Sequence, residues 1–157
     1  MNFISIQQYF NKLQIVFLIL LIIPLLAFIA LYFFAPESLL APRMELYIIV
    51  SLAAVADWIL AMIIFNKKIK SARNEQGLGA KLDKYFYITI VRSSFLSTSA
   101  LMLAAGFFLT QGSLFTALYV VNLVVALMLW PTGPRIAREL MLRGDEREMV
   151  YFKKDAL

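Results

Sequence analysis

The sequence predicts an all-α integral membrane protein: a four-helix bundle, both termini in the cytoplasm, with a short amphipathic interfacial helix at each end. The chain is 62% hydrophobic over 157 residues, and its mean hydropathy of +0.79 lies far above that of a soluble domain. The apolar residues fall into four long blocks, with most charges in the gaps. Blocks of about twenty residues match a hydrocarbon layer of about 30 Å, and at this length we expect one membrane domain, residues 1–157.

The first two spans follow an amphipathic N-terminal segment, residues 1–14. Apolar side chains recur there at helical spacing: Phe3, Ile6, Phe10 and Leu13. This pattern predicts the first interfacial helix. Span 1, about residues 15–34, is longer than the apolar core of a signal peptide, so we expect an uncleaved anchor, with a kink at Pro24. A proline-containing connector leads into span 2, about residues 46–65.

The second half of the chain contains two further spans. Its predicted segments are a cytoplasmic loop, span 3, span 4 and a cytoplasmic tail, at residues 66–85, 86–109, 114–130 and 131–157. The turn between spans 3 and 4 is so short that these spans must be antiparallel neighbours. Pro131 and Pro134 then end the membrane helix, and a second interfacial helix is expected after them.

The distribution of Lys and Arg predicts the orientation. Six cations lie between spans 2 and 3: Lys67, Lys68, Lys70, Arg73, Lys81 and Lys84. Six more follow span 4, whereas the connector between spans 1 and 2 contains only Arg43. Because cytoplasmic loops carry the excess of positive charge, we expect both termini on the cytoplasmic side. The membrane expected is the plasma membrane, which in a bacterium is the inner membrane.

The residue types that are missing exclude several kinds of chemistry. The chain has no cysteine and no histidine, which removes disulfides, thiolate or imidazole metal ligands and histidine-based catalysis. We therefore expect no metal and no cofactor, and we favour a non-enzymatic role over a lipid-handling enzyme, for which carboxylates, hydroxyls, amides and cations remain. The net charge of +5 comes from cations that flank the spans, so it indicates contact with lipid headgroups rather than nucleic acid.

Polar residues inside the spans are the candidates for function, because each costs free energy in lipid and usually finds a partner within the bundle. Asp57 lies in span 2, Arg92 in span 3 and Asn122 in span 4. At the helical rise, Asp57 lies about 13 Å and Arg92 about 9 Å from the cytoplasmic surface. The similar depths predict an Asp57–Arg92 ion pair if spans 2 and 3 are adjacent.

The surroundings of this pair allow two interpretations. Small and hydroxyl-bearing side chains follow Arg92 along span 3, among them Ser93, Ser97 and Thr98. In the first interpretation these residues, with Asp57, Arg92 and Asn122, are structural fasteners that fix the packing of the helices. In the second, Asp57 is a protonatable or cation-binding site whose charge state Arg92 modulates.

The C-terminal tail also has two interpretations. Arg135, Arg138 and Arg143 can meet phosphates while Ile136, Leu140 and Met141 lie against the bilayer. The tail is then either a solvated anchor helix or a docking site for a partner.

Two functions follow from these features. The first is a non-enzymatic multi-pass membrane protein that self-associates or is an accessory component of a membrane complex, with the lipid bilayer and a homo-oligomer or complex partner as its contacts. The alternative is a small proton- or ion-coupled transporter with Asp57 as its coupling carboxylate.

Overall fold

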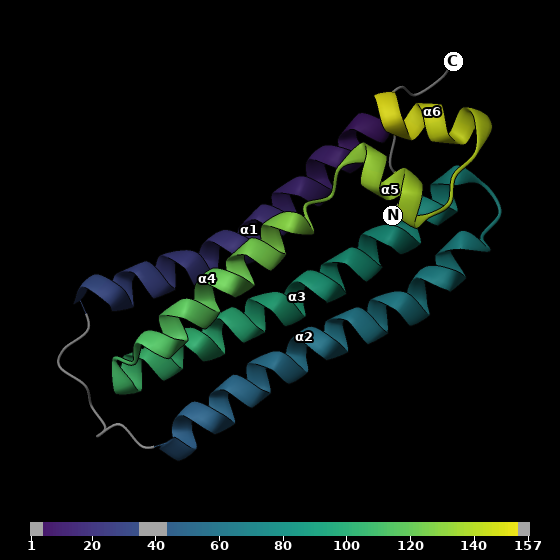
Figure 1. The fold of residues 1–157 in the computed structure, drawn as a ribbon. Helices are drawn as coiled ribbons and strands as arrows, with labels where there is room; N and C mark the ends of the chain where they lie inside the picture. Colours follow the sequence, from purple (N-terminus) through teal and green to yellow (C-terminus); the bar gives the residue numbers. More distant parts are fainter. Residues whose placement is uncertain (1–4, 35–43, 154–157) are drawn as a thin grey trace.

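The computed structural model describes residues 5–34 and 44–153, and these residues form six α-helices (Figure 1). In chain order the helices are α1 (Ile6–Phe34), α2 (Met44–Arg73), α3 (Leu78–Thr110), α4 (Ser113–Met128), α5 (Gly133–Glu139) and α6 (Gly144–Phe152). The expected all-α fold is confirmed for this part of the chain. The connector between spans 1 and 2 lies outside the described residues.

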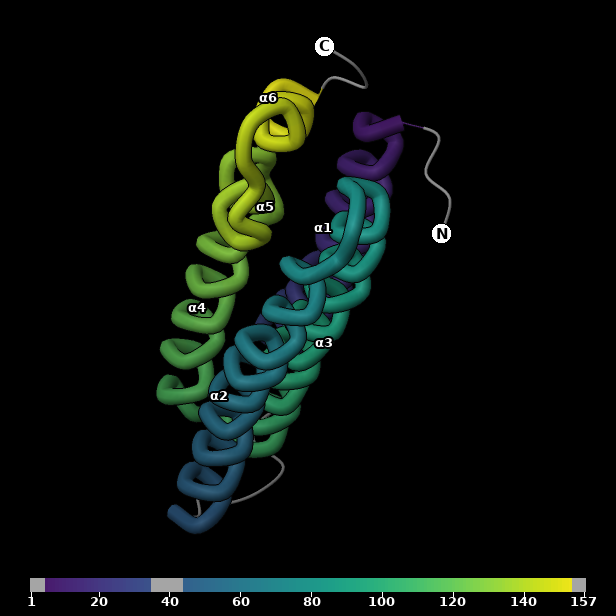
Figure 2. Tube along the Cα trace, turned by 90° about the vertical axis from the view of Figure 1, so that its right-hand side faces the viewer, coloured from purple at the N-terminus to yellow at the C-terminus, as the bar shows by residue number. Residues whose placement is uncertain are grey.

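Helix α3 is the centre of the bundle and packs against α1, α2 and α4. The long helices run side by side along one axis, and α5 and α6 lie at the same end as the beginning of α1 (Figures 1 and 2). Half of the most apolar stretch of α3 is buried, against 17% for α1 and for α2. The outer helices therefore expose most of their apolar surface.

Three helices are long and apolar enough to cross a membrane: α1, α2 and α3. Helix α4 has 16 residues and a length of about 24 Å at the helical rise, which is short for a bilayer. Helix α4 is long and apolar enough to cross a membrane only if it is taken together with α5, and the two helices are bent by 82° relative to each other. The described residues thus contain three or four of the expected spans.

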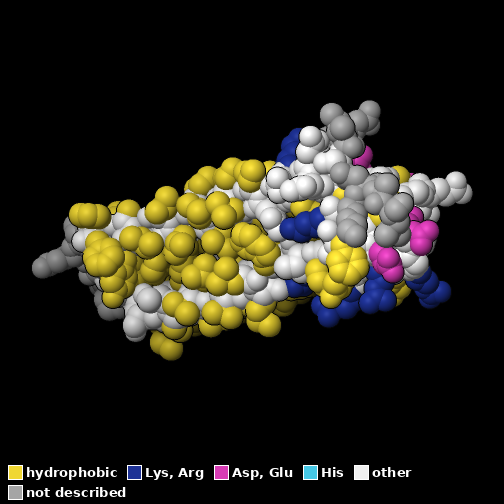
Figure 3. Space-filling view, turned by 90° about the horizontal axis from the view of Figure 1, so that it is seen from above, with side chains coloured by type: hydrophobic (Ala, Val, Ile, Leu, Met, Phe, Trp, Pro, Cys, Tyr) yellow, Lys and Arg dark blue, Asp and Glu magenta, His cyan; other side chains and the backbone are white. Residues whose placement is uncertain are grey.

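Charged side chains gather at one end of the molecule, while apolar side chains cover the rest of the face shown in Figure 3. This charged end contains the junction of α2 with α3, together with α5 and α6. The cytoplasmic placement of this end remains a prediction from the Lys and Arg distribution.

Two boundaries differ from the predicted ones because the polar segments remain helical. Residues 6–14 of the segment expected as a separate interfacial helix form the first turns of α1, with no break before span 1; residues 1–4 of that segment lie outside the described residues. Most of the expected loop at 66–85 is helix as well, since α2 continues to Arg73 and α3 begins at Leu78. Lys, Ser, Ala and Arg are all compatible with helix, and Ile69 and Leu82 are buried in the core.

The largest buried core lies at the charged end, and we call it the head cluster. Its buried members are Tyr9, Phe10, Leu13, Phe65, Ile69, Ala72, Leu82, Tyr85, Phe86, Ile88, Ile136, Ala137, Leu140, Leu142 and Val150. They come from α1, α2, α3, α5, α6 and the α5–α6 turn. The expectation that Ile136 and Leu140 lie against the bilayer is therefore wrong, since these side chains are 0% and 2% exposed within the protein.

Burial in the head cluster predicts that buried and exposed residues of the tail contribute differently to stability. Ile136→Ala should destabilise the protein by about 2–5 kcal/mol, the usual cost of removing a buried aliphatic side chain. Met141→Ala is the matched control, because Met141 is 63% exposed and its change should stay within about 0.5 kcal/mol. Thermal unfolding in detergent measures both, and equal shifts would show that the tail is not packed into the bundle.

Candidate functional site

Glu139, the last residue of α5, is the centre of a polar cluster that adjoins the head cluster. Tyr85 Oη of α3 donates a hydrogen bond of 2.5 Å to Glu139 Oε2. Arg135 Nε donates one of 2.7 Å to Oε1, and Arg92 Nη1 lies 3.7 Å from the same oxygen. Both carboxylate oxygens thus have partners, and two of the three partners come from α3.

Arg92 is 2% exposed, and it belongs to a helix that is long and apolar enough to cross a membrane. Its guanidinium carbon lies 3.9 Å from the centre of the Phe65 ring of α2, close enough for a cation–π contact. Its Nε and Nη2 atoms are buried and have no hydrogen-bond partner within residues 5–34 and 44–153. The charge of Arg92 is therefore balanced by Glu139 and the aromatic face of Phe65.

Side chains also satisfy backbone carbonyls at the ends of α4 and α5. The Met128 carbonyl at the end of α4 accepts a hydrogen bond from Arg135, and Gln14 Nε2 lies 3.4 Å from the Pro131 carbonyl. Since helix ends leave carbonyls without partners, these two contacts stabilise the 82° bend between α4 and α5. At the far end of α5, Arg73 Nε of α2 donates a hydrogen bond of 2.8 Å to the carbonyl of Glu139.

A separate ion pair holds α6 against the bundle. Lys81 Nζ of α3 lies 2.7 Å from Glu146 Oε2, and Val150 of α6 is fully buried in the head cluster. Helices α5 and α6 are thus each joined to the bundle by polar and apolar contacts.

The structure brings Arg92 to Glu139 and not to Asp57. Asp57 is half-buried on α2, and its Oδ2 atom is buried without a hydrogen-bond partner among the described residues. Glu139 was not among the predicted site residues, because residues 131–157 were expected to form a cytoplasmic tail outside the bundle. One signal was available: Glu139 lies within about 60° of Ile136 around a helix of 3.6 residues per turn, so this acid shares the apolar face.

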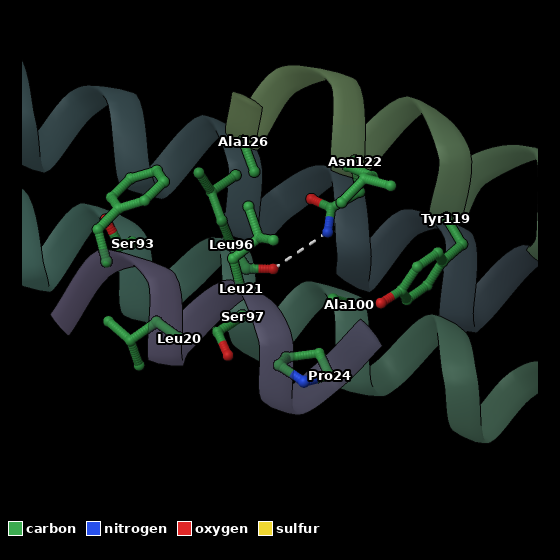
Figure 4. Close-up of a pocket in the computed structure, with 12 residues that line it drawn as sticks. Leu20, Leu21, Pro24, Ser93, Leu96, Ser97, Ala100, Tyr119, Asn122 and Ala126 are labelled. Carbon is green, nitrogen blue, oxygen red and sulfur yellow. Dashed lines mark hydrogen bonds between the residues drawn. The ribbon is translucent and has the colours of Figure 1, made fainter. Parts of the chain in front are cut away.

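Asn122 joins three helices near the middle of the bundle. Trp58 Nε1 of α2 donates a hydrogen bond of 2.8 Å to Asn122 Oδ1. Asn122 Nδ2 in turn donates one of 3.2 Å to the Leu96 carbonyl of α3 (Figure 4). This arrangement fits the fastener interpretation, and it gives Trp58 a polar partner that the sequence did not indicate.

The hydroxyl groups of α3 differ in what they contact. Ser93 and Thr98 donate to carbonyls four residues earlier in their own helix. Ser97 lines a cavity of about 30 Å³ between α1, α3 and α4, together with Asn122 and Tyr119 (Figure 4). That volume holds one or two water molecules and no larger ligand.

The three arginines singled out in the tail have different environments. Arg135 belongs to the Glu139 cluster, whereas Arg138 and Arg143 are exposed at the charged end. The exposed pair remains available for headgroups or a partner, and Arg135 is occupied within the chain.

Known proteins offer no guide to the role of these groups. Comparisons with protein-family models, with curated proteins and with solved structures found no match. Within the part of the chain that the structure describes, no group of three or more acidic residues could hold a metal ion. The chemistry shown is ion pairing and hydrogen bonding between helices.

The Glu139 cluster predicts a large loss of stability when its carboxylate is neutralised. Glu139→Gln leaves Arg92 buried without a counter-charge, and removing one partner of a buried ion pair costs about 3–5 kcal/mol. Glu148→Gln is the control, because Glu148 is an exposed acid of α6. Thermal unfolding in detergent should separate the two variants, and an unchanged midpoint for Glu139→Gln would refute the role of the cluster.

Proposed function

We propose that this protein is a non-enzymatic, multi-pass membrane component that self-associates through the outer face of α2. The observation that carries the proposal is Asp57, which is only half-buried on α2 and therefore partly accessible to a second copy, while its buried Oδ2 has no partner within the described residues of one copy. Two other polar side chains between the helices, Asn122 and Glu139, have partners inside the chain, and Arg92 has Glu139 as its counter-charge.

The cost of an unpartnered carboxylate supports an intermolecular contact. An acidic side chain at the centre of a membrane helix costs roughly 2.5–3.5 kcal/mol on insertion scales. A second copy can offset this cost, because a polar group on the facing helix can form a hydrogen bond with the carboxyl group. Polar side chains commonly join membrane helices in this way.

The position of Asp57 on α2 also supports this contact. Helix α2 buries one stripe of side chains against its neighbours: Ala54, Ala61, Phe65, Ile69 and Ala72. Asp57 lies at the margin of that stripe, about 70° around the helix from its centre. Ala53 and Ala56 flank it on the outer side and are not buried, so a second helix can approach closely.

The transporter alternative receives less support from these contacts. Arg92, the proposed modulator of Asp57, is instead paired with Glu139 and packed on Phe65. The transport hypothesis then depends on Asp57 alone. The cavity near Ser97 has a volume of about 30 Å³, and that is too small for a transport path.

The oligomeric state tests this proposal. The purified protein in mild detergent should have the mass of at least two copies, and Asp57→Leu should weaken association about fivefold, since an interhelical hydrogen bond contributes about 1 kcal/mol. Glu45→Gln is the control, because Glu45 is an exposed acid of the same helix. Light scattering across a dilution series gives both the mass of the assembly and the strength of association.

Two outcomes would overturn the proposal. The first is a monomeric wild-type protein in both detergent and lipid nanodiscs. The second is loss of pH-dependent ion flux in reconstituted vesicles on Asp57→Asn with the mass unchanged, which would favour the transporter.

A further inference from the structure

A groove of about 450 Å³ lies between α2 and α3 at the charged end. It is lined by Lys68, Ser71, Asp83, Lys84, Tyr87 and Ile88. We propose that this groove binds the headgroup of an anionic membrane phospholipid, with the phosphate between the two lysines. The proposal concerns a lipid site and does not depend on self-association of the protein.

Two lysines and an aromatic ring line the groove. Lys68 Nζ lies 5.3 Å from the centre of the Tyr87 ring. Lys84 Nζ donates a hydrogen bond of 3.1 Å to Ser71 Oγ and another to Glu75, with which it forms an ion pair. Glu75 thus offsets part of the Lys84 charge, which leaves Lys68 as the main cation for a phosphate. Basic pockets between membrane helices at the cytoplasmic side are typical headgroup sites.

The groove lies where the apolar surface of the helices begins. Four-residue steps from Lys68 along α2 reach Ile64 and Leu60, and one step from Tyr87 along α3 reaches Val91. Leu60 is 45% exposed and Tyr87 is 61% exposed. A phosphate held between the lysines thus has apolar side chains below it for the acyl chains, and the exposed tyrosine marks the interfacial level.

Asp83 narrows the class of ligand. Asp83 is one of the residues that line the groove, so its negative charge repels a free phosphate dianion more strongly than the single negative charge of a phosphodiester. Phosphatidylglycerol carries that single negative charge and no cation. Phosphatidylcholine is zwitterionic, and the two lysines repel its quaternary ammonium group.

Lipid titration tests the site in the full-length protein. Native mass spectrometry should show phosphatidylglycerol binding in preference to phosphatidylcholine. Lys68→Gln should weaken that binding about fivefold, because one cation near a headgroup contributes about 1 kcal/mol. Lys67→Gln is the matched control: it removes the same charge from the adjacent residue, which does not line the groove, and should leave binding unchanged.

Three results would overturn the proposal. An equal loss of phosphatidylglycerol binding in the Lys67 and Lys68 variants would show general attraction of the lipid to positive charge. Equal binding of phosphatidylcholine would show that the headgroup is not recognised, and full competition by inorganic phosphate would identify a free-anion site. Asp57 lies eleven residues from Lys68 on α2, about 16 Å deeper, so Asp57→Asn should retain the lipid whatever it does to self-association.

Discussion

The contact between Glu139 and Arg92 is the constraint on which the charged end of this protein depends. Removing two charges from water costs several kcal/mol for each ion, and good geometry with further hydrogen bonds must offset that cost. Here Tyr85 and Arg135 occupy the remaining positions around the carboxylate, and Phe65 covers the guanidinium. Arg92 is on α3 and Glu139 on α5, so the pair joins the two helices across the break at Pro131 and Pro134. The 82° bend at this break brings Glu139 to Arg92 and Ile136 into the head cluster.

The polar groups of the protein fall into three layers along the bundle. At the charged end, surface ions surround the groove between α2 and α3. Below it, Glu139 holds α5, and deeper still Asn122 joins Trp58 to the Leu96 carbonyl. The first layer would face the headgroup region in our proposal, and the other two bind the helices to one another. Asp57 belongs to none of these internal contacts, and for that reason our proposed function assigns it to a contact between copies.

Hydropathy and charge predicted the helical class and the apolar spans, because lipid demands long uninterrupted apolar segments. They also singled out Asp57, Arg92 and Asn122, since each is costly in lipid. The partners were harder to predict. Arg92 and Asp57 have similar depths, but depth alone does not specify which acidic residue pairs with Arg92. Glu139 lies beyond two prolines, in a segment whose sequence resembled a surface helix. Its position on the apolar face beside Ile136 was a local signal that only the tertiary contacts explain.

Site-directed labelling tests the central claim, that Glu139 holds α5 inside the bundle. The chain has no cysteine, so a single introduced thiol can be followed without background. Ile136→Cys should resist a water-soluble maleimide in native vesicles, while Arg138→Cys, at an exposed position two residues away, should react. Adding Glu139→Gln should make the thiol at position 136 reactive, because α5 is then released. Equal labelling of the two thiols in the presence of Glu139 would contradict this account.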